Sequence, residues 1–226
     1  MKNIIHTYKY EILLAALIQH LFTGIFLTDM VFYTKVLWPI NMVILAVAST
    51  GVFIEKGKWK NLLKIILSIV AVAFPLSVPL WGINHIFMTA LNLSLAVFYL
   101  FIFIEILRFL IKPSYVNRDI ITASACGYFL IIEISVFVLQ NFYYLDPNSF
   151  KGMGNSFSLA NSANIFMDLV YYCTITLTSI GFGDITPNTH VTKLLTSFLG
   201  VTGQFYSVVL VGILISKFTS SNSNNN

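Results

Sequence analysis

The chain has 226 residues, of which 57% are hydrophobic and 10% are charged, and its formal net charge is +4. Soluble domains carry about 25% charged residues, so this sequence cannot cover a water-facing surface, and lipid is the expected solvent. No dense basic patch interleaved with aromatic residues occurs, so nucleic acid is not an expected partner. Cys126 and Cys173 lie in apolar stretches without the spacing of a metal site.

Six stretches are long and apolar enough to predict membrane-spanning helices, each of which needs about 20 residues. They are residues 12–27, 36–54, 62–83, 86–111, 120–143 and 191–218. The polar tail, residues 219–226, is predicted to be disordered because it offers no core-forming side chains. The sequence therefore predicts an all-α integral membrane protein with six transmembrane helices.

Basic residues are distributed unevenly between the loops that six spans create. Ten lie on the side of the two termini and three on the other side, which accounts for all 13 Lys and Arg residues. Positive charges concentrate in cytoplasmic loops. We therefore predict a multi-pass protein of the cell (plasma) membrane with both termini in the cytoplasm, in which the loop between the fifth and sixth spans enters from outside.

The fourth span lacks the regularly spaced basic residues of a voltage sensor. Its one basic residue, Arg108, lies near the predicted cytoplasmic end, where it can pair with Glu105. A charge moved across the membrane is worth about 2.3 kcal/mol per 100 mV. A helix with one terminal Arg therefore predicts no steep voltage dependence.

An acidic residue, Glu133, lies in the middle of the fifth span. Ionisable groups at this depth are costly and often functional. Two interpretations stay open: a structural Glu, protonated or hydrogen-bonded, or a site bonded to the neighbouring short helix that sets a proton-dependent gate. His20 is expected to be structural or interfacial.

A different kind of segment lies between the fifth and sixth spans. Residues 145–163 are rich in Asn, Ser, Gly and Pro, which predicts a surface loop. Residues 164–178 are moderately apolar but too short to cross, so they predict a half-length re-entrant helix. Residues 176–184 then read TLTSIGFGD.

Gly181 and Gly183 in this run predict a backbone segment that lines a wet pore, although a lone Gly-x-Gly is more often a turn. Glycine opens conformations that turn successive carbonyls to one side, and rings of carbonyls can replace the hydration shell of K⁺. Ser179 adds a hydroxyl at the inner end, and Phe182 is expected to pack outward. The partly negative C-terminal end of the short helix favours a cation in the cavity.

On these residues the run resembles the signature of tetrameric potassium channels, Thr-x-x-Thr-x-Gly-Tyr-Gly-Asp, and the likeness covers residues 119–218. It implies a six-span, prokaryotic-type member that conducts K⁺ passively as a homotetramer among membrane lipids, with no cofactor and no soluble partner. The implied ion-coordinating residues of this selectivity filter are Ser179, Ile180, Gly181, Phe182 and Gly183, with K⁺ at the first four. The implied supporting residues are Thr178, Asp184, Tyr171 and Tyr172.

The run departs from the family pattern at two filter positions. Ser179 replaces the second Thr and Phe182 replaces the commonest Tyr, so K⁺ selectivity is expected to survive with a less certain filter stability. Ile175 stands where some bacterial members carry a Glu that bonds the Asp after the filter. We hypothesise that the Tyr171 hydroxyl takes over this bond to Asp184, so that Tyr171→Phe alters inactivation; a simple exposed Asp at the pore mouth is the alternative.

The sixth span contains Gly200 and Gly203 near its middle, and Gly203 falls at the hinge position of the family's inner helix. A glycine there lets the helix bend and open an internal gate. The alternative is a close helix contact, since small residues also occur at membrane helix interfaces. Both interpretations stay open at the sequence level.

The resemblance implies three parts. Residues 1–115 form a four-helix unit like a voltage-sensor domain without gating arginines, residues 116–218 form the pore domain, and residues 219–226 are the tail. A non-selective monovalent cation channel is the alternative function. An uptake subunit is disfavoured because such proteins hold several pore loops in one chain. An enzyme is not expected, because no GxSxG, HExxH or phosphate-binding glycine loop occurs.

Overall fold

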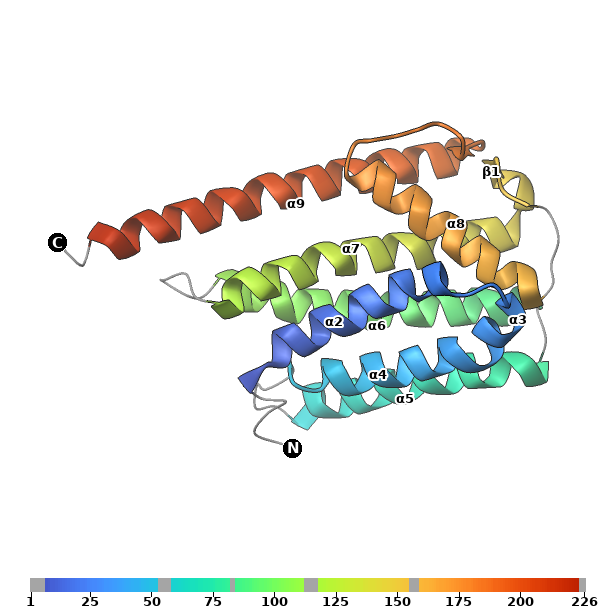
Figure 1. The fold of residues 1–226 in the computed structure, drawn as a ribbon, viewed down its shortest axis with the longest axis horizontal. Helices are drawn as coiled ribbons and strands as arrows, with labels where there is room; N and C mark the ends of the chain where they lie inside the picture. Colours follow the sequence, from blue (N-terminus) through green and yellow to red (C-terminus); the bar gives the residue numbers. More distant parts are fainter. Residues whose placement is uncertain (1–6, 53–57, 82–83, 112–117, 155–158, 224–226) are drawn as a thin grey trace.

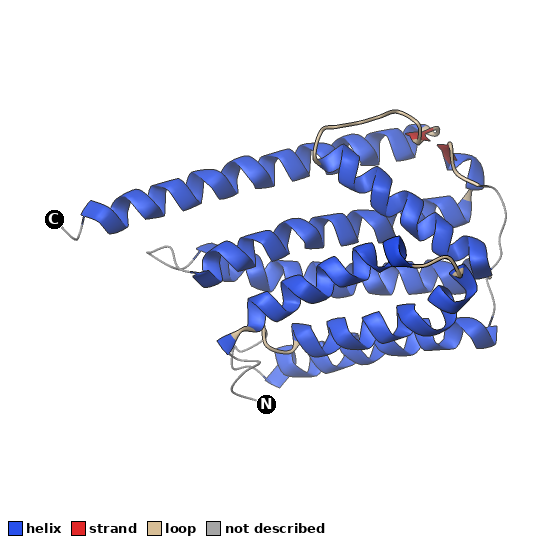
Figure 2. Ribbon diagram, in the orientation of Figure 1, coloured by secondary structure: helices blue, strands red, loops and turns tan. Residues whose placement is uncertain are grey.

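The computed structural model describes residues 7–52, 58–81, 84–111, 118–154 and 159–223. Almost all of them are helical, and two short strands lie near one end of the molecule (Figures 1 and 2). The major helices in chain order are α2 (Lys9–Phe22), α4 (Trp38–Ser49), α5 (Lys58–Trp81), α6 (His85–Ile111), α7 (Arg118–Leu145), α8 (Leu159–Leu177) and α9 (His190–Ser223). The shorter elements are η1 (Thr23–Phe26), α3 (Met30–Phe32), η2 (Tyr33–Leu37), η3 (Pro147–Ser149), β1 (Phe150–Lys151) and β2 (Thr186–Pro187).

Each of the six stretches predicted to cross the membrane is helical over most of its described length. Three helices of the described part are long and apolar enough to span a bilayer: Met30–Ser49, Ile86–Ile111 and Arg118–Leu145. A shorter apolar helix covers Ile65–Val78. These features are those of an all-α membrane protein.

The second of the predicted helices begins earlier than residue 36. Asp29 caps it, because its carboxylate accepts hydrogen bonds from the backbone N–H groups of Val31 and Phe32, each at 3.0 Å. The helix then runs through a wider turn, Tyr33–Leu37, into α4. Because Lys35 interrupts the apolar run, the sequence predicts that this helix starts at residue 36, and the cap at Asp29 was therefore missed.

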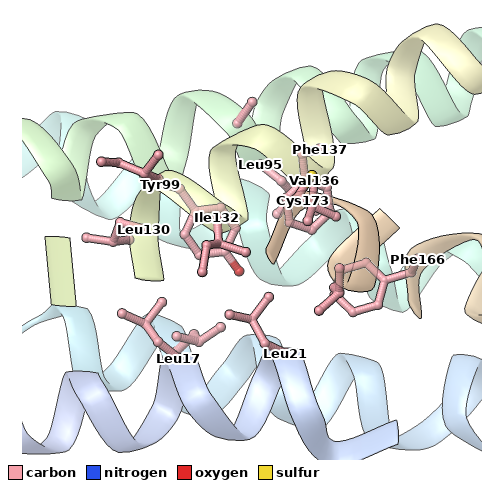
Figure 3. Close-up of a cluster of buried hydrophobic side chains, with 14 of the residues drawn as sticks. Leu17, Leu21, Leu95, Tyr99, Leu130, Ile132, Val136, Phe137, Phe166 and Cys173 are labelled. Carbon is pink, nitrogen blue, oxygen red and sulfur yellow. The ribbon is translucent and has the colours of Figure 1, made fainter. Parts of the chain in front are cut away.

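The helices of the N-terminal half pack directly on those of the C-terminal half of the same chain. α6 lies along α7, and α2 lies between α7 and α4. Leu17 and Leu21 of α2 meet Ile132 of α7 in one buried cluster, together with Phe166 of α8 (Figure 3). The units predicted as residues 1–115 and 116–218 therefore share one hydrophobic core, and the boundary between them lies outside the described residues.

The last helix, α9, projects beyond the bundle toward the C-terminus (Figure 1). It continues to Ser223, so the prediction of a disordered tail from residue 219 is wrong for residues 219–223, and residues 224–226 lie outside the described part. Ser and Asn are weak helix formers, but adding residues to an existing helix needs no new nucleus.

A close contact joins α7 to α9. The Tyr206 hydroxyl donates to the Ser124 carbonyl at 2.9 Å, and a Cβ added at Gly127 would lie 2.0 Å from that hydroxyl. Gly127 is therefore the residue that lets the Tyr206 ring lie against α7.

We predict that Gly127→Ala lowers the free energy of unfolding by about 1–3 kcal/mol, the usual cost of overpacking. Thermal unfolding of the purified protein in detergent measures it. Tyr206→Phe removes the clashing oxygen, so the double variant should lose less stability than the two single losses added together. Full additivity would contradict a steric conflict between these two positions.

Candidate functional site

The predicted re-entrant helix is present as α8, and it ends where the glycine run begins. It starts at Leu159 rather than residue 164, because the Leu and Ala residues of 159–163, predicted as loop, continue the helix. Its C-terminal end is closed by the run itself: the Ile175 carbonyl accepts the backbone N–H groups of Ile180 at 2.8 Å and Gly181 at 3.1 Å. The segment after α8 is thus held to the helix by its own amides.

The φ angles of this segment alternate in sign from one residue to the next. Ser179, Gly181 and Gly183 have φ values of 62°, 56° and 80°, and no other described non-glycine residue has a positive φ. Glycine adopts this conformation without steric cost, which explains Gly181 and Gly183. Ser179 adopts it with a side chain, and sequence reasoning did not anticipate this.

The N–H groups turned toward Ile175 set the direction of the carbonyls. All described peptide bonds are trans, so the N–H of Ile180 and the carbonyl of Ser179 lie in one plane and point in opposite directions. The same holds for the N–H of Gly181 and the carbonyl of Ile180. Both carbonyls therefore point away from the end of α8. Ile180 and Phe182 are 57% and 71% exposed in the single chain.

A glutamine of α9 holds the start of the run. Gln204 Nε2 donates to Ser179 Oγ at 2.5 Å and lies 3.5 Å from the Leu177 carbonyl. This contact stabilises the left-handed conformation of Ser179 from the side of α9. Sequence reasoning missed the role of Gln204, although a long polar side chain within an apolar helix was the available signal.

The hypothesised bond behind the run is present. The Tyr171 hydroxyl donates to Asp184 Oδ2 at 2.7 Å, and its ring stacks on Phe182 with centroids 6.4 Å apart and planes 6° apart. Tyr171 thereby joins Phe182, in the middle of the Gly181–Gly183 stretch, and Asp184, just after it, to α8. This hydrogen bond is also the main reason that the pKa of the Asp184 carboxyl lies below its usual value.

The second tyrosine of α8 points to a different helix. The buried Tyr172 donates to Thr196 Oγ1 of α9 at 3.0 Å, and its ring meets that of Phe150 edge-on at 5.5 Å. Tyr172 therefore fixes α8 against α9 and against β1. Thr178, at the end of α8, donates its hydroxyl to the Thr174 carbonyl at 2.7 Å.

A small sheet anchors the chain after the run. β1 pairs antiparallel with β2, with Phe150 opposite Pro187 and Lys151 opposite Thr186. Gly152 has a φ of 85°, and a Cβ there would lie 2.1 Å from the Asp184 carbonyl oxygen. Glycine is required at this position because the loop before α8 passes directly over the backbone of Asp184.

Gly200 and Gly203 of α9 differ in their surroundings. A Cβ at Gly203 would lie 2.3 Å from Leu177 Cδ2, whereas the nearest atom to a Cβ at Gly200 would be Thr176 Cγ2 at 3.9 Å. The geometry at Gly203 is that of the close helix contact named as the alternative to a hinge. The contact with Leu177 explains the glycine at position 203 without a bend of α9.

The acidic residues of the membrane helices have partners within the chain. Glu133 is bonded to His20 of α2 at 2.7 Å, which agrees with the interpretation of Glu133 as a hydrogen-bonded structural residue, and this described bond goes to α2 and not to the short helix. Phe166 and Cys173 of α8 lie near this pair as well, but the hydrogen bond to Glu133 comes from α2. Glu105 and Arg108 pair on α6, as predicted.

Comparison with known proteins gives matches over the same part of the chain. Residues 120–220 match a family model described as an ion channel. This range covers α7, the glycine run and α9 almost to its end.

The matching relatives are plant proteins. The chain is 36% identical over 61 residues to two-pore potassium channel 4 of Arabidopsis thaliana, a match covering 27% of this chain and 22% of the relative. It is 32% identical over 91 residues to two pore potassium channel a of Oryza sativa subsp. japonica, covering 40% and 22%. The match to two-pore potassium channel 3 of Arabidopsis thaliana is 28% over 103 residues, covering 45% and 21%. The chain thus matches about a fifth of each relative's length. No solved structure matches.

We predict that Tyr171→Phe raises the pKa of Asp184 toward that of an ordinary carboxyl, because the hydroxyl that favours the ionised form is gone. The bond stabilises the fold above the pKa of a free carboxyl, and its contribution is lost as the pH falls through the lowered pKa of the folded state. Carboxyl NMR of the protein in nanodiscs measures the titration. Tyr172→Phe is the control and should leave Asp184 unchanged; equal shifts in both variants would contradict the assignment.

We predict that Gly203→Ala lowers the free energy of unfolding by about 1–3 kcal/mol, since the new methyl meets Leu177. Gly200→Ala, one helical turn away, should be neutral or slightly stabilising because Ala is the better helix former. Thermal unfolding of both variants gives the comparison. Equal stabilities would show that Leu177 moves aside, and would favour the hinge interpretation of Gly203.

Proposed function

We propose that this chain forms the pore of a potassium-selective channel, as a ring of four identical subunits that conducts K⁺ passively. The observation that carries the proposal is the alternating backbone of Ser179, Gly181 and Gly183, with the carbonyls of Ser179 and Ile180 turned away from α8. Carbonyl rings of this kind replace the water shell of K⁺. The ion-coordinating residues are proposed to be Ser179, Ile180, Gly181, Phe182 and Gly183.

The requirement for several subunits follows from the environment of these carbonyls. Irregular backbone at membrane depth is tolerated only where it is buried in protein or lines a water-filled cavity. In the single chain the run is exposed, and one chain supplies one run. A closed ring of copies places the exposed carbonyls around an aqueous axis, and four is the number that the family resemblance implies.

The inner helix supports the same assembly. A stripe of exposed apolar side chains runs along α9 with alternating spacings of four and three residues, formed by Leu194, Phe198, Val201, Phe205 and Val208. A repeat that averages 3.5 residues is the pattern that lets helices pack against one another over many turns. Gln204 lies beside this stripe and reaches Ser179, so neighbouring α9 helices in the ring would surround the lower end of the filter.

The relatives support the proposal that the conducted ion is K⁺. Their names are those of potassium channels, and the residues that match the ion-channel family model include the proposed filter. With six spans and the charge asymmetry of the loops, we propose a plasma-membrane protein with cytoplasmic termini. Because Arg108 is the one basic residue of α6 and pairs with Glu105, no steep voltage dependence is proposed. K⁺ in the filter is the only bound species that the proposal requires.

The test is the reversal potential of the purified protein in planar bilayers, with K⁺ on one side and Na⁺ on the other. We predict reversal near the potassium equilibrium potential and block by Ba²⁺. Reversal near zero would favour the alternative, a non-selective monovalent cation channel in which Ser179 and Phe182 have weakened the filter.

Gly181→Ala tests the role of the backbone in the same recording. A Cβ at Gly181 has no neighbour within 4 Å, so the substitution acts through its φ of 56° alone. We expect reduced selectivity or loss of current. Gly154→Ala, at an equally open position without a positive φ, is the matched control and should behave as the wild type.

A further inference from the structure

A buried His–Glu pair lies where the N-terminal helices meet the pore-forming half. His20 Nδ1 of α2 and Glu133 Oε1 of α7 are 2.7 Å apart, and both side chains are 0% exposed. The rings of Tyr99, Phe137 and Phe166 lie 5.2–6.3 Å from the His20 ring, centroid to centroid, and Phe137 and Phe166 belong to the buried cluster shown in Figure 3. Burial disfavours an isolated charge, so the two groups can remain ionised at this depth only while they stay together.

The pair leaves hydrogen-bonding capacity unused. His20 Nε2, Glu133 Oε2 and the Tyr33 hydroxyl are buried and have no hydrogen-bond partner within the described part of the chain. Buried polar groups are nearly always satisfied by protein or ordered water. Three such groups around one pair are costly for a purely structural contact, and they give the pair acceptors and donors for a further proton or a water.

The titratable groups that face Glu133 come from four helical elements. In the described part of the chain they are His20 of α2, Tyr33 of η2, Tyr99 of α6 and Cys173 of α8. None of the other three is ordinarily charged at neutral pH. His20 is thus the one cationic partner of Glu133 among them, and the net charge of the cluster depends on the protons held by this pair.

A small cavity lies next to the cluster. Its volume is about 20 Å³, and its lining includes Tyr33, Trp38, Gln140 and Phe166. This is room for one water molecule. Among the described residues, Trp38 Nε1 and the Tyr33 hydroxyl of the lining lack partners, so the cavity offers polar contacts to a buried water.

The pair is in contact with the helix that carries the filter. The His20 ring packs on Phe166 of α8 with centroids 5.2 Å apart, and on Phe137 of α7 at 6.3 Å. The C-terminal end of the same helix accepts the filter amides at Ile175. A change in the separation of α2 and α7 at His20 would therefore act on α8.

We propose that His20 and Glu133 form an intramembrane proton-binding site, and that its occupancy sets how firmly the N-terminal helices hold the pore. The inference rests on the proposed channel function. The pair has no net charge either when His20 is protonated and Glu133 is ionised or when both groups are neutral. Uptake or loss of one proton leaves a net charge in a dry environment, and this is relieved by admitting water from the adjacent cavity or by moving α2 away from α7.

The test is the single-channel open probability of the full chain in planar bilayers, measured between about pH 8 and pH 5, where histidine changes its charge. We expect open probability to change by about tenfold, which is the effect of one unit of difference in proton affinity between two conformations. Glu133→Gln and His20→Gln keep the size of the side chains and should each flatten this dependence.

Two control variants each remove a titratable group that lies away from the pair. Glu105→Gln removes a carboxylate that pairs with Arg108 on α6, and His190→Gln removes a histidine at the exposed start of α9. Both should retain the wild-type pH profile. If they flatten it and the pair variants do not, the site is elsewhere and the proposal is overturned.

A spectroscopic measurement covers variants that do not conduct. The infrared difference spectrum of the bilayer-reconstituted protein between the two pH values should contain a carboxyl band that Glu133→Gln removes. Its absence from the wild type would overturn the proton site. Selective currents without pH dependence would overturn this inference alone, whereas reversal near zero with a pH dependence that Glu133→Gln flattens would overturn the potassium selectivity and leave the proton site supported.

Discussion

The fold depends on the rule that backbone N–H and C=O groups at membrane depth need partners. The helices satisfy their own groups, and the residues after α8 do not form a helix. Only their N–H groups find partners in the helix: the amides of Ile180 and Gly181 donate to the Ile175 carbonyl, and the carbonyls of Ser179 and Ile180 face away from it. Glycine at Gly181 and Gly183 permits this geometry, and irregular backbone of this kind is tolerated at membrane depth where it is buried in protein or lines a water-filled cavity.

A segment with this backbone has no regular structure of its own, so its shape is imposed by neighbours. α8 contributes Tyr171, which binds Asp184 at the outer end. α9 contributes Gln204, which binds Ser179 at the inner end. The loop before α8 contributes β1, which pairs with β2 beyond Asp184. Contacts from three elements thus fix a segment whose φ angles alternate in sign, and the groups that make these contacts come from α8, α9 and β1, outside the segment itself.

Local features of the site could be predicted from the sequence, and long-range partners could not. The six apolar stretches, the short helix and the glycine run follow from composition and spacing. The bond between Tyr171 and Asp184 was accessible because both flank the run. The pairs Gln204–Ser179 and His20–Glu133 depend on how each helix is rotated about its axis, which apolar periodicity defines weakly in helices that are hydrophobic all round. Helix ends at Met30, Leu159 and Ser223 were missed for local reasons, namely a cap, favourable Ala and Leu residues, and propagation.

The spacing of the buried pair has a consequence for biosynthesis. His20 and Glu133 are 113 residues apart, and ribosomes add about 5–20 residues per second, so His20 precedes its carboxylate by roughly 6–23 seconds. During that interval α2 holds an imidazole in or near the bilayer without the group that neutralises or binds it. The N-terminal helices are therefore synthesised before they can fold completely, because their final packing requires α7.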